Sequence, residues 1–291
     1  MIIVKIHYGL GNQLFQYALA RSLSIQQGKE FKLDISYFGG EPDKDHPRIY
    51  QLCHFNINEN IAGPKEIDSF IKPGFLKRRW REIIHIGLPY YKKKVVYENG
   101  LSFDNDIFHV EDNSYLFGYW QDERYFSAIQ DQLRKDLSFK TAPSSLNKEF
   151  LQQIEETTSV CIHIRRGDYL TDQSTVTTIG ICDLPYYYNA IEIVRSKINN
   201  PVFYIFSDEM EWVKREFKID QPCIYVDHNS QEMAYEDLRL MSACKNHIIA
   251  NSSFSWWGAW LSNNKDQLVI APKVWRKQGP EMYLPKGWVP L

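Results

Sequence analysis

The sequence contains few cysteines, and they form no pattern typical of a metal site or a disulfide framework. The five thiols are scattered, odd in number and include no CxxC pair: Cys53, Cys161, Cys182, Cys223 and Cys244. This distribution argues against a structural zinc site and favours reduced thiols in a cytoplasmic protein.

Long apolar runs are also absent. No stretch approaches the roughly 18 apolar residues that span a bilayer, and the segment Ile2 to Ile6 after Met1 is too short for the apolar core of a signal peptide. We therefore expect a chain that neither crosses a membrane nor is exported by the usual signal. A net charge of -2 gives no overall attraction to nucleic acid, so any basic surface must be local.

Two nucleotide-binding signatures and one metal-binding signature are missing. The turn Gly9-Leu-Gly11 has Leu14 where the dinucleotide motif GxGxxG needs its third glycine, and no GxxxxGK[ST] motif occurs. The nearest approach to an Asp-x-Asp motif for a metal-bound nucleotide is Asp104-Asn-Asp106, which we interpret as a loop. NAD-dependent and P-loop kinase functions are therefore disfavoured.

Strand-like and helix-like segments alternate along the chain and predict an α/β protein with mostly parallel sheets. A strand, a glycine turn and a helix open the chain, whereas the proline-interrupted stretch 42–97 favours helices and loops over sheet. A second alternating series begins near residue 148. The polar segment 140–147 contains a proline and is the best linker candidate, so we expect domains at 1–140 and 148–291.

The segment His163-Ile-Arg-Arg-Gly-Asp168 places two guanidinium groups directly after an expected buried strand. Ligands of open α/β sheets bind outside the carboxyl ends of the strands, and paired guanidinium groups beside a glycine suit an anion such as phosphate. The alternative is an Arg–Asp pair that only caps the strand. This motif alone favours neither interpretation.

A second expected strand end carries hydroxyl groups. The segment Asn251-Ser-Ser-Phe-Ser-Trp-Trp-Gly-Ala-Trp260 follows an apolar run and predicts a helix that begins with serines and backbone N–H groups. Such a helix start can hold an anion. In the alternative interpretation Ser252 and Ser253 form an ordinary helix cap, and the three tryptophans belong to the core.

The turn Gly9-Leu-Gly-Asn-Gln13 presents two amides, Asn12 and Gln13, after the first expected strand. Amides donate and accept hydrogen bonds at once, so they suit a hydroxyl-rich ligand. Alternatively, the glycines only make a tight turn and Asn12 caps the following helix.

Four segments together resemble the bacterial α-1,2-fucosyltransferases of glycosyltransferase family 11, within the wider group of GDP-fucose-dependent fucosyltransferases. The resemblance covers most of the chain. It rests on residues 9–18 (GLGNQLFQYA), 163–169 (HIRRGDY), 206–208 (FSD, with Trp212 following) and 251–260 (NSSFSWWGAW). One departure is Tyr8, at a position where relatives often have another glycine.

The resemblance implies a GT-B architecture, in which two Rossmann-like domains face a central cleft. The N-terminal domain would bind mainly the acceptor sugar and the C-terminal domain GDP-fucose. Arg165 would bind the diphosphate, His163 would lie near the nucleoside, and Asp237 would read guanine. In the alternative interpretation Asp237 caps its helix or pairs with Arg239.

The same resemblance assigns the remaining contacts. The first-domain motif places Asn12 close to the reacting sugar, and the serine motif supplies the residues against the phosphates, which are Ser252, Ser253 and Phe254. A guanidinium together with hydroxyl and N–H donors would stabilise the charge that grows on departing GDP. No metal cofactor is then expected.

The implied reaction is an inverting transfer of L-fucose from GDP-β-L-fucose to the 2-hydroxyl of a terminal β-galactoside. His163 and Asp168 are candidates for accepting the acceptor proton, although Asp168 could equally hold Arg165 in place. The alternatives are a GDP-sugar transferase of another linkage and a non-catalytic carbohydrate-binding protein. The 8 Trp and 18 Tyr residues would suit the latter, because aromatic faces stack on sugar rings.

One region is strongly basic and aromatic: residues 75–84 (FLKRRWREII), followed by Lys92-Lys-Lys94. Such a run is ordinarily a solvated face. A transferase with a lipid-linked acceptor, as in O-antigen or other surface-glycan synthesis, would instead use it at the anionic cytoplasmic leaflet. We therefore expect a cytoplasmic protein with salt-sensitive, peripheral binding to the inner membrane through residues 76–94.

Overall fold

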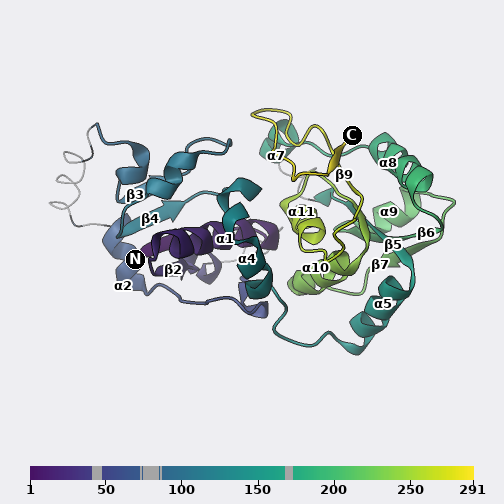
Figure 1. The fold of residues 1–291 in the computed structure, drawn as a ribbon, viewed down its shortest axis with the longest axis horizontal. Helices are drawn as coiled ribbons and strands as arrows, with labels where there is room; N and C mark the ends of the chain where they lie inside the picture. The colour runs from purple at the N-terminus through teal and green to yellow at the C-terminus, as the bar shows by residue number, and fades with distance from the viewer. Residues whose placement is uncertain (41–47, 73, 75–84, 86, 168–172) are drawn as a thin grey trace. The chain divides into compact units, whose positions relative to one another are not determined.

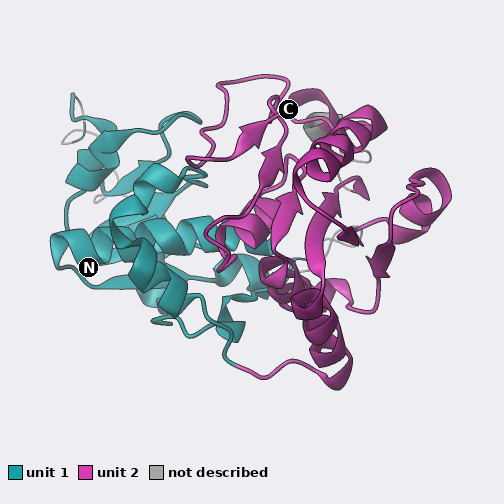
Figure 2. Cartoon of the chain, turned by 45° about the vertical axis from the view of Figure 1, so that its right-hand side comes forward, with its two compact units in different colours: residues 1–140 teal, residues 141–291 magenta. Residues whose placement is uncertain are grey.

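In a computed structural model the chain divides into two compact units, unit 1 (Met1–Lys140) and unit 2 (Thr141–Leu291), which Figure 2 colours separately. The structure describes residues 1–40, 48–72, 74, 85, 87–167 and 173–291. Each unit is built on one parallel sheet with helices packed against it. The division falls at the start of the proline-containing segment 140–147.

Unit 1 contains a four-stranded parallel sheet in the order β2-β1-β4-β3. The strands are β1 (Ile2–Lys5), β2 (Phe31–Asp34), β3 (Val95–Tyr97) and β4 (Ser114–Phe117). The helices are α1 (Leu10–Gln27), α2 (Pro64–Ile71) and α4 (Gln130–Asp136). Figure 1 shows α1 lying along this sheet, and the helix ends where Gly28 adopts the left-handed backbone conformation (φ 63°).

The prediction of helices and loops throughout 42–97 is wrong for the last three residues of that stretch, because Val95–Tyr97 forms the edge strand β3. A strand of three residues is too short to show a periodic pattern, and its place in the sheet comes from pairing with β4. The segment Asp104-Asn-Asp106 starts a short 3-10 helix, in which the Asp104 carboxylate accepts the backbone N–H of Asp106 at 2.9 Å.

Unit 2 contains a six-stranded parallel sheet in the order β10-β9-β8-β5-β6-β7. The strands are β5 (Thr158–Ile164), β6 (Pro201–Ser207), β7 (Cys223–Val226), β8 (Asn246–Ile248), β9 (Val269–Ala271) and β10 (Val289–Pro290). The helices are α5 (Ser145–Glu156), α7 (Gln173–Thr178), α8 (Leu184–Lys197), α9 (Met210–Glu216), α10 (Ala234–Ala243) and α11 (Ser253–Trp260).

Helices cover both faces of the unit 2 sheet, so its central strands are apolar on both sides. Alternate residues of β5, namely Val160, Ile162 and Ile164, pack with α8 and α9. Cys161 faces the other side and packs with α5 and α10. Since side chains alternate along a strand, His163 points to the same face as Cys161.

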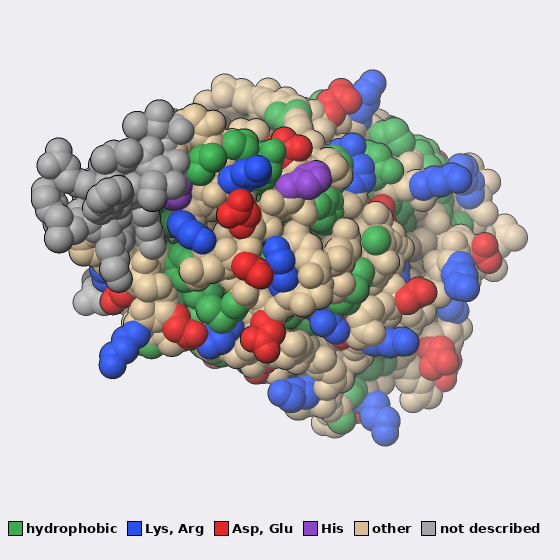
Figure 3. Space-filling view, turned by 60° about the vertical axis from the view of Figure 1, so that its left-hand side comes forward, with side chains coloured by type: hydrophobic (Ala, Val, Ile, Leu, Met, Phe, Trp, Pro, Cys, Tyr) green, Lys and Arg blue, Asp and Glu red, His purple; other side chains and the backbone are tan. Residues whose placement is uncertain are grey.

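The structure describes only part of the expected membrane-binding segment. Residues 75–84 lie outside the described residues, whereas Lys92, Lys93 and Lys94 are described near the start of β3. On the face drawn in Figure 3, Lys and Arg side chains are interspersed with Asp and Glu. Within the described part of the chain, no helix combines the length and apolarity needed to span a bilayer. Peripheral membrane binding stays a prediction.

Candidate active site

The carboxyl ends of β5 and β8 form the switch point of the unit 2 sheet. From β5 the chain adds β6 and β7 on one side, and then returns to add β8, β9 and β10 on the other. Ligands of open α/β sheets bind where the strand order reverses in this way. β5 leads directly into Arg165, and β8 leads through Asn251 into α11, so the two sequence motifs meet at this position.

Arg165 pairs with a carboxylate that follows the next strand. Its Nη1 lies 3.1 Å from Oδ2 of Asp208, and Oδ1 of Asp208 accepts the backbone N–H of Arg166 at 3.0 Å. A Cβ at Gly167 would overlap this carboxylate, so the glycine makes room for Asp208. Asp208 lies in the FSD motif, but nothing local in the sequence indicated that it pairs with Arg165.

The second arginine of the motif has structural contacts on both sides. Nε of Arg166 lies 3.3 Å from Oε2 of Glu209, and its guanidinium carbon lies 3.4 Å from the ring centre of Trp212. An arginine stacked on an indole and paired with a carboxylate is held in one orientation. Arg165 is therefore the better candidate of the two for a ligand.

His163 connects the two sides of the switch point. Its ring centre lies 5.7 Å from that of Phe254 in α11, and only 3% of the residue is exposed. Burial, together with the charge of Arg165, lowers the pKa of His163 to about 3, so the ring is neutral at pH 7. Nδ1 is buried and has no hydrogen-bond partner among the described residues. A group with so low a pKa is a weak proton acceptor, which favours a hydrogen-bonding role over a general-base role.

The serine motif begins α11. Oγ of Ser252 accepts the backbone N–H of Phe254 at 3.3 Å and so caps the helix, and Ser253 is its first residue. The cap interpretation of Ser252 is thus confirmed, and it is compatible with anion binding because other N–H groups of the first turn remain directed out of the helix end. Asn251 links this strand end to two other segments, because its Nδ2 donates to the carbonyl oxygens of Gly180 at 3.1 Å and Trp275 at 3.2 Å.

The tryptophans of this motif belong to the core, as the alternative interpretation held. Trp256 and Trp257 are fully buried, and Trp260 is 3% exposed. Their rings pack on one another with centres 5.1 to 6.1 Å apart. They stabilise α11 and thereby fix the position of the helix start.

Asp237 lies in the first turn of α10, at the edge of the sheet where β7 ends. Its Oδ1 accepts a hydrogen bond from Nδ2 of Asn229 at 2.8 Å. Burial raises the pKa of Asp237 to about 7, the nearby charge of Glu236 adds to this, and the bond from Asn229 opposes it. Arg239 is paired with Glu236, with Nε 2.8 Å from Oε2.

Asn12 lies in unit 1, in the first turn of α1. Its Oδ1 accepts a hydrogen bond from Nε2 of Gln121 at 2.6 Å. Gln13 is buried and used structurally, since its Nε2 donates to the carbonyl oxygens of Tyr8 and Ile49, both at 2.8 Å. The amide expected to face a ligand is therefore Asn12, and Gln13 holds the turn together.

The structure thus gathers five of the predicted residues at the switch point of unit 2 or beside it: His163, Arg165, Ser252, Ser253 and Phe254. Asp237 lies at the same edge of this sheet, whereas Asn12 belongs to the other unit. The predicted residue Asp168 lies outside the described residues.

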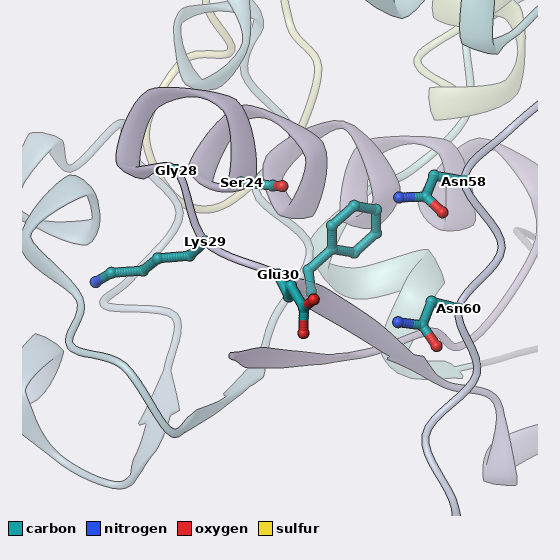
Figure 4. Close-up of a pocket in the computed structure, with 7 residues that line it drawn as sticks. Ser24, Gly28, Lys29, Glu30, Asn58 and Asn60 are labelled. Carbon is teal, nitrogen blue, oxygen red and sulfur yellow. The ribbon is translucent and has the colours of Figure 1, made fainter.

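Two cavities of unit 1 lie away from these residues. The smaller, about 350 Å³, lies between the end of α1 and the start of β2 and is shown in Figure 4; it is lined by Ser24, Gly28, Lys29, Glu30, Phe31, Asn58 and Asn60. The other, about 710 Å³, lies beside α4. The cavity of Figure 4 is at the amino end of β2, opposite the end at which parallel sheets bind ligands.

Two Rossmann-like units, one of them with a guanidinium, a buried imidazole and a capped helix start at its switch point, have the architecture of GT-B glycosyltransferases. A solved structure titled "Crystal structure of NodZ alpha-1,6-fucosyltransferase soaked with GDP-fucose" has the same fold, with a TM-score of 0.50 and 14% sequence identity. The match covers 98% of this chain and 99% of that chain.

Sequence comparison places the chain more narrowly. Residues 90–289 match the model of glycosyl transferase family 11. An alpha-1,2-colitosyltransferase of Escherichia coli is 33% identical over 289 residues, covering 94% of this chain and 92% of that protein. The O-antigen biosynthesis glycosyltransferase WbnK of Escherichia coli is 32% identical over 285 residues, covering 92% of each. The chain belongs to glycosyltransferase family 11.

Proposed function

We propose that this enzyme is an inverting α-1,2-fucosyltransferase that uses GDP-β-L-fucose and a terminal β-galactoside. The observation that carries the proposal is the meeting of Arg165 and the start of α11 at the switch point of the unit 2 sheet. Both supply positive electrostatic potential where a diphosphate would lie. The relative named as an alpha-1,2-colitosyltransferase supports the linkage, and the motifs at residues 163–169 and 251–260 support the GDP-sugar donor.

In the proposed reaction, the 2-hydroxyl oxygen of galactose attacks C1 of fucose from the face opposite to GDP. The bond between C1 and the β-phosphate oxygen breaks, GDP leaves with the electron pair, and the hydroxyl proton passes to a base. The charge on the phosphate grows as this bond breaks, so Arg165 and the N–H groups of α11 stabilise the transition state more than the ground state. His163, with its low pKa, serves as a contact to the donor.

A second donor is favoured by one observation, the similarity to an alpha-1,2-colitosyltransferase. Colitose is L-fucose without its 3-hydroxyl, so both sugars would present the same diphosphate and reactive carbon to Arg165. An enzyme that hydrogen-bonds the 3-hydroxyl rejects the deoxy sugar strongly, whereas one that does not accepts both. Contacts to the 3-hydroxyl would therefore decide whether the enzyme uses GDP-fucose, GDP-colitose or both.

Acceptor-dependent release of GDP tests the proposal. Lactose is added to the enzyme with GDP-fucose, GDP-colitose or GDP-mannose in separate reactions. We expect release that requires both lactose and one of the first two donors. Release from neither would contradict the proposed donor class, and binding of lactose without any release would indicate a carbohydrate-binding protein.

Activity is expected to survive an excess of EDTA. The positive charge opposite the diphosphate would come from Arg165 and from the N–H groups at the start of α11, which take the place that Mg²⁺ or Mn²⁺ occupies in metal-dependent transferases. Initial rates with and without EDTA, on protein first dialysed against chelator, measure this. A strict requirement for added divalent metal would contradict the assigned role of Arg165.

A further inference from the structure

A cluster of aromatic rings occupies the switch point of the unit 1 sheet. The strand order reverses between β1 and β4, so the carboxyl ends of these strands are where this sheet would bind a ligand. Tyr8 follows β1, Tyr37 follows β2, Phe117 ends β4 and Tyr119 follows it. Tyr8, Tyr37 and Phe117 are 44%, 39% and 37% exposed. We call these four rings the aromatic cluster.

The aromatic cluster surrounds one buried imidazole. The ring centre of His7 lies 4.9 Å from that of Phe117, 5.1 Å from Tyr119, 5.2 Å from Tyr8 and 6.2 Å from Tyr37. His7 is 2% exposed, and burial lowers its pKa to about 4. The imidazole is therefore neutral at pH 7, with one nitrogen that donates and one that accepts.

Gln16 determines which nitrogen of His7 carries the proton. Its Oε1 accepts the backbone N–H of His7 at 3.0 Å, and its Nε2 donates to the carbonyl oxygen of Gly118 at 3.2 Å, so the amide has one orientation. The other hydrogen of Nε2 is directed at Nδ1 of His7, 2.9 Å away, and makes Nδ1 the acceptor. The carbonyl oxygen of Lys5 is farther from Nδ1, at 3.4 Å.

The proton of His7 therefore lies on Nε2. This N–H is buried and has no hydrogen-bond partner among the described residues. A buried donor without an acceptor destabilises the protein. A hydrogen bond to an incoming hydroxyl oxygen would remove this cost. A hydroxyl oxygen can reach Nε2 only if a ring of the aromatic cluster moves, and Tyr8 and Tyr37 are the two most exposed of these rings.

The backbone at this edge is held in conformations that side chains rarely adopt. Tyr8 has φ 63°, in the left-handed region that favours glycine, and Gln13 holds its carbonyl oxygen at 2.8 Å. Trp120 has φ 52°, and Glu98 accepts its N–H at 2.8 Å and that of Tyr119 at 2.7 Å. Residues in such conformations concentrate at functional sites, where the surrounding structure maintains them.

We propose that the aromatic cluster is the subsite that binds the galactose ring of the acceptor. The apolar C–H face of the sugar would stack on the exposed rings, and one of its hydroxyl oxygens would accept the N–H of His7 Nε2. Asn12 lies in the first turn of the helix that follows Tyr8 and is tied through Gln121 to the segment after β4, so it adjoins the same edge. The identity of the sugar rests on the proposed function.

Tyr8→Gly tests the stacking contact. The substitution removes the ring and suits the left-handed backbone, so relief of that strain offsets part of the packing lost with the ring and the variant should still fold. We expect the KM for lactose to rise on the order of 10-fold, with the Kd for GDP unchanged. An unchanged KM for lactose in this variant would overturn the proposal.

Two control variants separate the loss of the ring from the relief of the left-handed backbone. Asn113→Gly relieves a left-handed residue of unit 1, with φ 60°, without removing a ring. Tyr283→Ala removes from unit 2 a tyrosine of similar exposure, 41%. Both should keep the wild-type KM for lactose. A rise in KM in either variant equal to that of Tyr8→Gly would overturn the assignment to the aromatic cluster.

His7→Phe tests the hydrogen bond, because phenylalanine fills the ring space and lacks the N–H. Binding of galactosides that each lack one hydroxyl is compared between variant and wild type. We expect His7→Phe to weaken every galactoside except the one that lacks the hydroxyl facing Nε2. Equal weakening of all of them would give His7 a packing role and overturn its part in the subsite.

Binding measured without transfer separates this proposal from the proposed function. Lactose is titrated into enzyme saturated with GDP and followed by ligand-observed NMR. Binding that Tyr8→Gly weakens on the order of 10-fold supports the subsite even if the wild type transfers no sugar from either donor. Transfer by the wild type with lactose binding unaffected by Tyr8→Gly would overturn the subsite and leave the proposed function standing.

Discussion

Replacing Arg165 with alanine is expected to lower the rate of sugar transfer by a factor of about 100 to 1,000 while unit 2 stays folded. The guanidinium supplies the main side-chain charge at the switch point, and loss of such a contact to developing charge costs about 2 to 4 kcal/mol of transition-state stabilisation. kcat and KM for GDP-fucose measure the effect, and thermal unfolding reports on the fold. Arg165→Lys should also be slow, because a single ammonium cannot replace a bidentate fork.

A second substitution separates this chemical effect from a structural one. Removing Arg165 leaves Asp208 with the backbone N–H of Arg166 but without its ion-pair partner at 3.1 Å. Arg165→Ala combined with Asp208→Asn removes that unpaired charge. If the loss of rate came from the stranded carboxylate, the double variant would regain activity; we expect it to stay inactive. Arg195→Ala, on the exposed face of α8, should leave the rate unchanged.

Asp237→Asn is expected to weaken GDP binding on the order of 10-fold at pH 8 and to remove most of its dependence on pH. A carboxylate accepts hydrogen bonds from N1 and N2 of guanine, and charge-assisted bonds of this kind are worth about 1.5 to 3 kcal/mol. An asparagine directs one oxygen at these donors and carries no charge. Titration calorimetry with GDP and ADP at several pH values measures the affinity and the selection for guanine.

The sign of the pH effect follows from the raised pKa of Asp237, about 7 in the folded protein. Below this pH the carboxyl group is protonated and cannot accept both guanine hydrogens, so GDP binding should strengthen as the pH rises through about 7. The effect on folding has the opposite sign. A raised pKa stabilises the ligand-free protein below the unfolded pKa of about 4, and this contribution is lost as the pH rises through 7.

Asp227→Asn is the matched control for Asp237→Asn. Asp227 also follows β7, but it is exposed and pairs with Lys214 at 2.5 Å. Its substitution should leave GDP affinity and its pH dependence as in the wild type. Equal binding of GDP and ADP by the wild type would show that Asp237 does not read guanine.

Most of unit 2 could be predicted from the sequence, because its central strands are buried on both faces and appear as apolar runs. Two of these runs are followed by a motif. Arg165 and Ser252 could be located for this reason: each directly follows such a run. The order of the strands, and hence the switch point that brings the two motifs together, depends on pairing between distant segments. The partnership of Arg165 with Asp208 depends on the same pairing and was missed.

Unit 1 was harder to predict from sequence. Strands β3 and β4 have only three and four residues, so neither shows a period, and both are placed by pairing across the sheet. Tyr8 stood out as a departure from a glycine, but its left-handed backbone became visible only in the structure. The donor nitrogen of His7 depends on the orientation of Gln16, which no sequence pattern encodes.

The linkage of the product tests the central claim most directly. The enzyme is incubated with GDP-fucose and lactose, and the trisaccharide is purified and analysed by NMR. We predict a single product, with L-fucose α-linked to O2 of galactose and one GDP released for each sugar transferred. A β-linked product, fucose on a different oxygen, or GDP released without any trisaccharide would contradict the account.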